Sequence, residues 1–482
     1  MTAATGRPAL HFTTRQNWIN DPNGLLWLDG TWHLFYQHNP FGAAWGNMSW
    51  GHATSTDLLH WTEHPVAIAC TPEESIFSGS AVLDRANSSG FGEPGRPAIV
   101  AVYTSALASG RQAQSLAYST DGGYHWTKYE QNPVLDRGST AFRDPKVFWY
   151  TADDGTGYWV MVAVEADDHR VVLYRSDTLR EWHYLSDVGP LDSPDGLWEC
   201  PDLFRLPIDG DPANPGWVLI VSRDPGRTGT GSYTAYLTGD FDGERFTPHP
   251  GVGLRRVDHG RDFYAGVTFD GAPGGRRVML AWLSNWNYAE VTPTDPWRGA
   301  MSIPRELALV TGDGAPELTQ RLPAEIEGSD SWASPVTVAP FLLEGRRPLA
   351  LELPSIVDLE LEPRGATAIG WEWTVGDTLV ARVEYEPASS QLTLSRPDPS
   401  PGVHPTFASV ERLTVPLTGG RLRLRLLLDH TSIELFADAG RVTWTDVVFP
   451  GAESGGAVVF ARGGQALVAA TVRRGERGDP IL

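Results

Sequence analysis

A short motif that repeats along the first 250 residues constrains the fold most. Each copy is a turn rich in Ser and Asp that ends at an aromatic residue: STDLLHW ends at Trp61, STDGGYHW at Trp126, SDTLREW at Trp182, and a degenerate copy at Phe246. The closing aromatics are about 60 residues apart, the length of a four-stranded propeller blade with generous loops. The repeat therefore favours a radial array of blades over a β-sandwich of similar length, which is the structural alternative.

The segments between these turns indicate strands. β-Branched and aromatic runs such as AIVAVYTS, GYWVMVAV and RVMLAWLS alternate with clusters of Gly, Asp, Asn and Pro, and helix signals are nearly absent before residue 300. This texture is typical of an all-β protein. We therefore expect residues 1–310 to form a β-propeller of about five blades, at about 60 residues each.

The sequence pattern changes after the predicted propeller region. Residues 311–336 are irregular and rich in Gly and Pro, as in a domain linker. Beyond them the chain alternates apolar and polar residues, most clearly in RLRLRLLLDHTSIELFADAG (Arg421–Gly440). Such alternation is typical of antiparallel sheets with one buried face and one solvent-exposed face. Residues 337–482 are accordingly predicted to form a β-sandwich.

Composition narrows the classes of partner and cofactor. The formal charge of −21 argues against nucleic acid and anionic membranes as partners. We find no phosphate loop, dinucleotide fingerprint or HExxH motif, and the 13 histidines show no metal-ligand spacing, so neither a metal nor a cofactor is expected. Cys70 and Cys200 are the only cysteines, expected as two reduced thiols, with one bridge between them as the alternative.

The sequence also bears on location. No apolar run approaches the roughly 18 residues needed to span a bilayer. The N-terminal stretch MTAATGRPALHF lacks a basic region followed by an apolar one, the pattern of a secretory signal. We expect a cytoplasmic protein if Met1 is the native start, and a secreted one if a leader was removed.

Three carboxylates stand in unusual contexts. Asp21 lies in WINDPNG, whose DPNG is close to an ideal tight turn; Asp144 lies in FRDPK, between Arg143 and Pro145; Glu199 lies in LWECPD, ahead of a predicted strand. Each has a structural alternative: a turn residue, a surface ion pair with Arg143, and a solvated strand edge. Innermost propeller strands converge on one axis, which can bring the three acids together. Clustered carboxylates cost stability unless one is protonated or the site uses them.

The motifs resemble glycoside hydrolase family 32, the β-fructosidases that include invertases, levanases and inulinases. The likeness is carried by WINDPNG, FSGS at Phe77–Ser80, RDP at Arg143–Pro145 and WECPDLF at Trp198–Phe204, and it continues through DFYAGVTF, WLSNWNYA, PWRGAMSIPREL and DHTSIELF. It covers nearly the whole chain. The resemblance implies a five-bladed β-propeller followed by a β-sandwich, in agreement with the pattern of strands.

The resemblance also implies roles for individual residues. Asp21 would be the nucleophile, Glu199 the general acid/base, and Asp144 the stabiliser of the transition state. Residues expected at the substrate are Asn20, Gln37, Trp45, Phe77, Ser78, Arg143, Asp262 and Trp282. For Asn20 and Gln37 the alternative is hydrogen bonding within turns and strands, and Trp45 and Trp282 could instead be core residues.

These roles predict a retaining glycosidase, in which Asp21 stays ionised and Glu199 begins protonated. We expect the enzyme to release terminal β-D-fructofuranosyl residues from levan, inulin, fructo-oligosaccharides and sucrose, because WLSNWNYA resembles the levanase and exo-inulinase branch of the family. In that branch Trp282, Asn285 and Trp286 would lie at the rim of the pocket. A sucrose-specific invertase, a fructosyltransferase and a catalytically inactive carbohydrate-binding protein are the alternatives. The preference between β-2,1 and β-2,6 linkages and the oligomeric state stay open.

Overall fold

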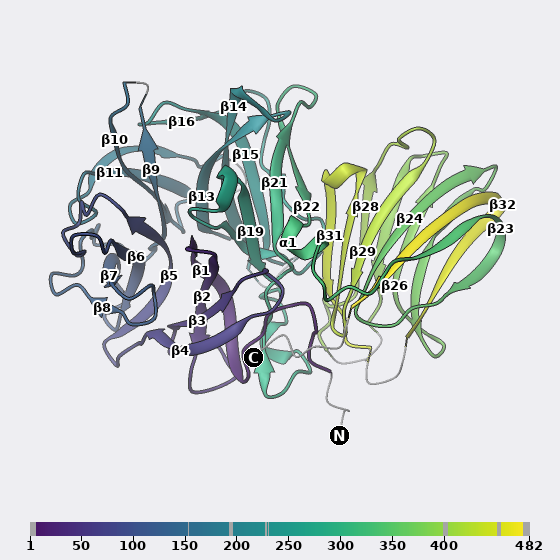
Figure 1. Ribbon diagram of the computed structural model, residues 1–482, viewed down its shortest axis with the longest axis horizontal. Coiled ribbons are helices and arrows are strands. Elements are labelled where there is room, and N and C mark those ends of the chain that lie inside the picture. The colour runs from purple at the N-terminus through teal and green to yellow at the C-terminus, as the bar shows by residue number, and fades with distance from the viewer. Residues whose placement is uncertain are drawn as a thin grey trace.

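The computed structural model describes residues 6–152, 154–191, 196–226, 229, 231–398, 403–450 and 455–475. It is built almost wholly from antiparallel β-sheets, so the all-β prediction is confirmed. Figure 1 shows two parts side by side, an N-terminal array of sheets and a C-terminal pair of layers. No helix of the described residues is long and apolar enough to cross a membrane. Residues 1–5, on which the expectation about Met1 rests, lie outside the described residues.

The N-terminal part consists of sheets made of consecutive strands. The first contains β1 (Asn17–Leu28), β2 (Thr31–Asn39), β3 (Ser49–Ser55) and β4 (Thr62–Ile68), and the short β20 (Trp297–Arg298) runs parallel to β1. The second contains β5 (Glu74–Asp84), β6 (Ala98–Leu107), β7 (Gln112–Ser119) and β8 (Thr127–Lys128). The third contains β9 (Phe142–Thr151), β10 (Gly157–Glu165), β11 (Arg170–Ser176) and β12 (His183–Val188).

Two further groups of strands are joined by a single bridge between Ile208 and Leu309. One group contains β13 (Leu197–Ile208), β14 (Asp211–Asp224), β15 (Tyr233–Phe241), β16 (Phe246–Pro248) and β17 (Arg255–Arg256). The other contains β18 (Tyr264–Thr268), β19 (Arg277–Trp282), β21 (Arg305–Val310) and β22 (Glu317–Arg321). The strands β1, β5, β9, β13 and β18 contact one another in that cyclic order, and β18 contacts β1 again.

The repeated turn motif caps the connections between strands. Asp57 accepts hydrogen bonds from the backbone of Leu59 and His60, and Asp121 does the same for Tyr124 and His125. Both carboxylates therefore cap the turns that follow these strands. The closing aromatics Trp61, Trp182 and Phe246 are buried, so each turn is tied to the core beneath it.

The five strands in cyclic contact share a local irregularity. Each breaks its pairing register near its N-terminal end: between Ile19 and Pro22, Phe77 and Gly79, Arg143 and Lys146, Glu199 and Asp202, and Tyr264 and Val267. Strands β1 and β13 each have a second break further along. Such β-bulges bend a strand and re-aim its side chains. Two of the bulges carry Asp144 and Cys200 in the left-handed region, at φ 61° and 46°, and Pro follows both, a residue that strands tolerate at bulges.

This irregularity corrects one expectation. The DPNG of Asp21–Gly24 is not a tight turn but lies inside strand β1, which pairs with β2 on both sides of the bulge. Gly24 has φ 52°, and a Cβ there would lie 2.8 Å from the Phe35 ring and 2.9 Å from the Trp50 ring. The turn-forming residues therefore make a bulge under tight packing, because cross-strand pairing outweighs local turn preference.

The segment predicted as an irregular linker is partly regular. Within residues 311–336, β22 pairs with β21, and a single helical turn, α1 (Ala324–Glu327), follows. The pairing extends the preceding sheet by one strand, which its Gly- and Pro-rich surroundings conceal in the sequence. Short 3₁₀ turns lie at Pro273–Gly275, Ala289–Val291 and Asp438–Gly440.

The C-terminal part is a single hydrogen-bonded sheet that folds over on itself. Its strands are β23 (Val336–Leu349), β24 (Ser355–Arg364), β25 (Ala368–Val375), β26 (Thr378–Glu386), β27 (Gln391–Arg396), β28 (Ser409–Thr414), β29 (Leu422–Leu428), β30 (Ser432–Ala437), β31 (Val442–Val447) and β32 (Gly455–Arg474). The long β32 pairs with β25 along its first half and with β24 along its second. Trp371 of β25 and Leu426 of β29 belong to one buried core, so the two halves pack face to face.

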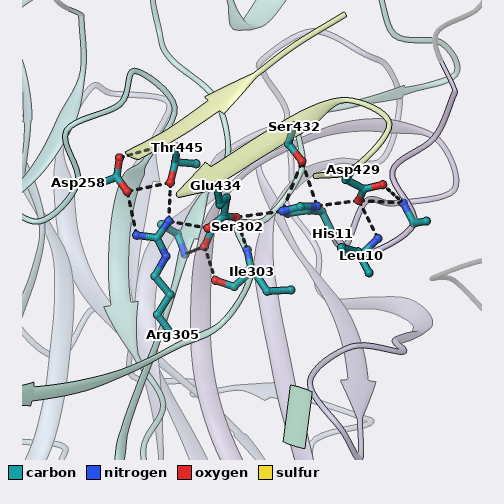
Figure 2. Close-up of polar contacts among 12 residues, drawn as sticks. Leu10, His11, Asp258, Ser302, Ile303, Arg305, Asp429, Ser432, Glu434 and Thr445 are labelled. Carbon is teal, nitrogen blue, oxygen red and sulfur yellow. Dashed lines mark hydrogen bonds and ion pairs between the residues drawn. The ribbon is translucent and has the colours of Figure 1, made fainter. Parts of the chain in front are cut away.

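A buried chain of charges joins the two parts (Figure 2). His11 lies between the carboxylates of Asp429 and Glu434, at 2.8 and 2.9 Å, and Glu434 also receives Arg305 at 2.5 Å. Arg305 in turn contacts Asp258 at 2.8 Å. Burial alone would lower the pKa of His11, but hydrogen bonds from its ring to Asp429 and Glu434, and their negative charges, raise the pKa to about 9.

This raised pKa predicts a pH-dependent share of stability. The folded pKa lies above the ordinary value of 6.5, so the stabilisation is fully present below about pH 6.5 and is lost as pH rises through about 9. We expect His11→Gln to lower the free energy of unfolding by about 3 kcal/mol at pH 6. Denaturant unfolding at pH 6 and pH 10 measures the gap between the wild type and the variant, which should narrow at pH 10. An equal gap at both pH values contradicts the charge assignment.

Candidate active site

Three carboxylates meet where the bulged strands converge. Asp21 comes from β1, Asp144 from β9 and Glu199 from β13. The thiol of Cys200 lies 3.4 Å from Asp21 Oδ2 and 3.7 Å from Asp144 Oδ2, and the Arg143 guanidinium lies 4.0 Å from Asp144 and 3.1 Å from Glu199. Residues more than a hundred positions apart in the sequence thus form one cluster.

Asp21 is held by donors on both carboxylate oxygens. Asn20 Nδ2 donates to Oδ1 at 3.1 Å, and Ser78 Oγ donates to Oδ2 at 2.6 Å. The Trp18 indole in turn donates to Asn20 Oδ1 at 2.8 Å, which orients the amide. Burial and the charge of Glu199 raise the pKa of Asp21, while these donors act in the opposite direction and favour the carboxylate.

Asp144 is fixed through its backbone and through its side chain. Its N–H donates to Thr104 Oγ1 at 2.9 Å, and the Cys200 N–H donates to its Oδ2 at 3.0 Å. Burial, followed by the charge of Glu199, raises the pKa of Asp144 to about 7, although Arg143 acts to lower it. Burial and the Glu199 charge together outweigh Arg143, whose guanidinium lies closer to Glu199 than to Asp144.

Glu199 is the most open of the three, with its side chain 20 % exposed. Arg143 Nε donates to Oε1 at 3.1 Å, and the Tyr264 hydroxyl donates to Oε2 in a short hydrogen bond. Arg143 is itself held by Gln112 Oε1 at 3.3 Å. Two donors from separate strands therefore orient one carboxyl group that still reaches solvent.

Three full negative charges in this cluster would destabilise the folded protein. Like carboxylates at close quarters in a water-poor site disfavour joint ionisation, and Arg143 supplies one positive charge against three acids. The raised pKa of Asp144, at about 7, means that a proton resides in the cluster near neutral pH. A site of this kind has an acidic group and an ionised nucleophile available together.

Several residues expected at the substrate lie in or beside this cluster. Asn20, Ser78 and Arg143 contact the carboxylates directly. The buried amide of Gln37 donates to the Ile76 carbonyl at 3.0 Å, next to Phe77. Trp45, which is 46 % exposed, meets the Phe77 ring edge-on at 6.0 Å, so the two aromatics form a partly open border.

Asp262 and Trp282 are not part of the cluster, which corrects their expected roles. Asp262 is fully buried against the C-terminal part, where Arg396 binds it at 2.6 Å. Trp282 is fully buried among Trp18, Tyr264 and Trp286. Both side chains are enclosed by protein and cannot contact a sugar.

The expected rim also loses Asn285. Its buried amide donates to the carbonyls of Ser232 and Arg261, at 3.1 and 2.7 Å, which is a structural role. Only Trp286 of the proposed rim residues keeps partial exposure.

Three contacts in the cluster were not predicted from the sequence. Cys200 bridges Asp21 and Asp144, Tyr264 holds Glu199, and Gln112 holds Arg143. Cys200 and Tyr264 stand in motifs already noted, WECPD and DFYAG, so their position could have been inferred from the motif but not their partners. No local sequence motif points to Gln112 as a residue of the site.

Among residues 6–475 with the gaps given above, no group of three or more His, Cys, Asp or Glu side chains is arranged to hold a metal ion.

Comparisons with known proteins agree on one family. Residues 11–321 match the model for the glycosyl hydrolases family 32 N-terminal domain, and residues 357–474 match the family 32 C-terminal model. The chain is 39% identical to a levanase of Bacillus subtilis over 95% of this chain and 68% of that protein. It is also 39% identical to an extracellular exo-inulinase of Aspergillus ficuum, over 95% and 92% of the two chains. The crystal structure of an exo-inulinase from Aspergillus awamori superposes with a TM-score of 0.89 at 35% identity, covering 98% of both chains.

The burial of Cys200 predicts selective thiol chemistry. Burial, and then the charges of Asp21, Asp144 and Glu199, raise the pKa of the Cys200 thiol, whereas Cys70 is partly exposed. Both cysteines are free in the structure. Treatment of the folded protein with iodoacetamide at pH 8 should alkylate Cys70 and spare Cys200, because the thiolate is the nucleophile. Mass spectrometry of peptides reads this out; equal labelling before and after unfolding would contradict the buried, protonated thiol.

Proposed function

We propose that this chain, which belongs to glycoside hydrolase family 32, releases terminal non-reducing β-D-fructofuranosyl residues from fructans and sucrose by a retaining mechanism. The observation that carries the proposal is the cluster of Asp21, Asp144 and Glu199 on bulged strands. Family membership supports a β-fructosidase, and the cluster supplies the two carboxyl groups that a retaining glycosidase needs.

We assign Asp21 as the nucleophile. Its carboxylate would attack the anomeric C2 of the fructosyl unit while the C2–O bond to the leaving group breaks, giving a covalent fructosyl-enzyme. The donors Asn20 and Ser78 hold the carboxylate in one orientation and favour its ionised form. A fixed nucleophile reduces the entropic cost of reaching the transition state.

We assign Glu199 as the general acid/base. It would protonate the leaving oxygen in the first step and take a proton from water in the second, when water attacks C2 and releases Asp21. Its partial exposure suits a group that must meet both a departing sugar and an incoming water. Arg143 and Tyr264 would keep its carboxyl group directed at that oxygen.

Asp144 would bind fructose hydroxyls and stabilise the positive charge that develops at the ring in the transition state. A carboxylate beneath an oxocarbenium-like centre is electrostatically favourable, more so in a water-poor site. Asn20, Gln37, Trp45, Phe77, Ser78 and Arg143 are the further residues that we propose for the fructose pocket.

The surroundings of the pocket support cleavage from the chain end. Trp45 and Phe77 border the cluster, and a hollow of about 310 Å³ beside Phe77 and Gln112 offers room for sugars beyond the first. We propose that the site over the carboxylates admits one terminal fructose, with the rest of the polymer outside. Levan, inulin, fructo-oligosaccharides and sucrose all present that unit. Action on polymers would place the enzyme outside the cell, like the extracellular exo-inulinase.

We further propose the finer architecture. The groups that begin at β1, β5, β9, β13 and β18 would be the five blades of a β-propeller, since their first strands contact each other in a ring. The folded-over C-terminal sheet would be a β-sandwich. The proposed domains are residues 1–310 and 337–482, with 311–336 as the connection.

Two substitutions test the catalytic roles. Asp21→Asn should abolish turnover of sucrose because the nucleophile is lost, while the melting temperature stays close to that of the wild type. Glu199→Gln should lower kcat/KM on sucrose by about 10²–10⁴-fold, and by much less on an aryl β-fructofuranoside whose leaving group needs no proton. Steady-state kinetics on both substrates provides the measurement. Near-normal sucrose hydrolysis by both variants would refute the assignment.

The mode of attack is tested by early product analysis. Chromatography of brief digests of levan and inulin should show fructose as the sole small product, because one terminal unit enters the pocket at a time. Early di- and trisaccharides would indicate an endo-enzyme, and activity on sucrose alone would indicate an invertase. Growth of longer oligosaccharides from concentrated sucrose would indicate a fructosyltransferase.

A further inference from the structure

One short segment of the N-terminal part runs along the edge of the C-terminal part. Residues 258–262, in the loop before β18, donate two backbone hydrogen bonds to β31: the His259 N–H donates to the Thr443 carbonyl at 2.9 Å, and the Asp262 N–H donates to the Thr445 carbonyl at 3.0 Å. A Cβ on Gly260 would lie 2.1 Å from the Thr445 carbonyl oxygen. The two backbones are thus in the closest contact that glycine allows.

Buried ion pairs fix both ends of this segment. At one end Asp258 accepts hydrogen bonds from Arg305 and from Thr445 of β31 (Figure 2). At the other end Asp262 accepts one from Arg396 of β27 at 2.6 Å and one from the Val447 N–H at 2.9 Å. The side chains of Asp262 and Arg396 are fully buried. Losing one partner of such a pair costs about 3–5 kcal/mol, so the segment is held firmly.

The segment leads directly to a residue of the candidate active site. Tyr264 follows Asp262 by two positions, opens strand β18, and donates its hydroxyl to Glu199 Oε2. Two residues of extended chain span at most about 7 Å, and Phe263 between them is buried, so a shift at Asp262 is passed to Tyr264 with little room to relax.

We infer that Asp262 is a positioning residue for the reaction: through its pairing with Arg396 and β31, the C-terminal part sets the Tyr264 hydroxyl that orients the acid/base Glu199. The inference rests on the proposed function, because it takes Glu199 to be the acid/base. It gives the C-terminal part a role in proton transfer that needs no contact with the sugar. Arg143 holds the other oxygen of Glu199 from β9, so loss of the Asp262 anchor should weaken catalysis without abolishing it.

The test uses the full chain and two substrates that differ in their need for a proton. Asp262→Asn should lower kcat/KM for sucrose by about tenfold, since misplacement of a catalytic group by about 1 Å can cost up to 10²-fold. On an aryl β-fructofuranoside with an activated leaving group the loss should be less than about twofold, because little proton donation is needed there. Tyr264→Phe should show the same pattern, and the double variant should be no worse than Tyr264→Phe alone.

A matched control separates positioning from stability. Asp429→Asn removes an equally buried carboxylate charge from the same interface, where it pairs with His11 and not with the 258–262 segment. It should lower the melting temperature and leave both kcat/KM values within about twofold of the wild type. Tyr288→Phe is a milder second probe, removing only the hydroxyl that donates to Asp262 Oδ1 at 2.7 Å, and should give a smaller loss on sucrose alone.

The outcomes distinguish the inference from the proposed function. Equal losses on both substrates for Asp262→Asn and Tyr288→Phe, or losses matched by Asp429→Asn, overturn the positioning role. If Asp262→Asn does not fold, Tyr288→Phe decides by the same comparison. If the rate loss of Glu199→Gln does not depend on the leaving group, the acid/base assignment itself is wrong. If the rate loss of Glu199→Gln depends on the leaving group and the losses of the Asp262 and Tyr288 variants do not, only the inference about Asp262 is wrong.

Discussion

The structure depends above all on the gathering of three carboxyl groups at one point. Carboxylates repel one another and lose hydration when buried, so Asp21, Asp144 and Glu199 require compensation from everything around them. Part of that compensation comes from the bulges of the converging strands, which direct the Cys200 N–H at Asp144 and place Ser78 against Asp21. Arg143 supplies the one cation in direct contact among the described neighbours of the cluster. The irregular strands are therefore the condition under which the cluster can exist.

The interface between the two parts is also built from buried charged groups, which here fix the position of one part against the other. Arg305 and Arg396 are fully buried and each meets two carboxylates from different parts of the chain. An apolar interface would tolerate small sliding motions, whereas charge pairs at fixed positions accept one register. The inferred positioning of Glu199 through Asp262 and Tyr264 relies on such an interface.

The sequence predicts the type of fold and the three carboxylates because both signals are local. The alternation of apolar runs and turn residues that indicates strands is visible within short stretches of sequence. Each of the three acids lies in a short motif that can be recognised without knowledge of the fold. The residues Asp21–Gly24 locally favour a turn, but pairing with β2 overrules that preference. Asp262 and Trp282 were misassigned because burial is set by neighbours distant in the sequence: Arg396 lies 134 positions from Asp262. The contacts of Cys200, Tyr264 and Gln112 escaped prediction for the same reason, since a motif identifies a residue but not its partner.

Strand β32 has a consequence for the order in which the molecule is completed. It lies between β24 and β25 and also pairs with β23, yet it follows every other strand of its sheet in the chain. On a ribosome that adds about 5–20 residues per second, the roughly 200 residues between Asp262 and β32 take about 10–40 seconds to emerge. The N-terminal sheets can pair during that interval, but the strand that β31 and Arg396 depend on for their final packing has not yet been made. The nascent chain would thus pair β18 with β19 before Asp262 meets Arg396, and the closing of the C-terminal sheet would complete the molecule last.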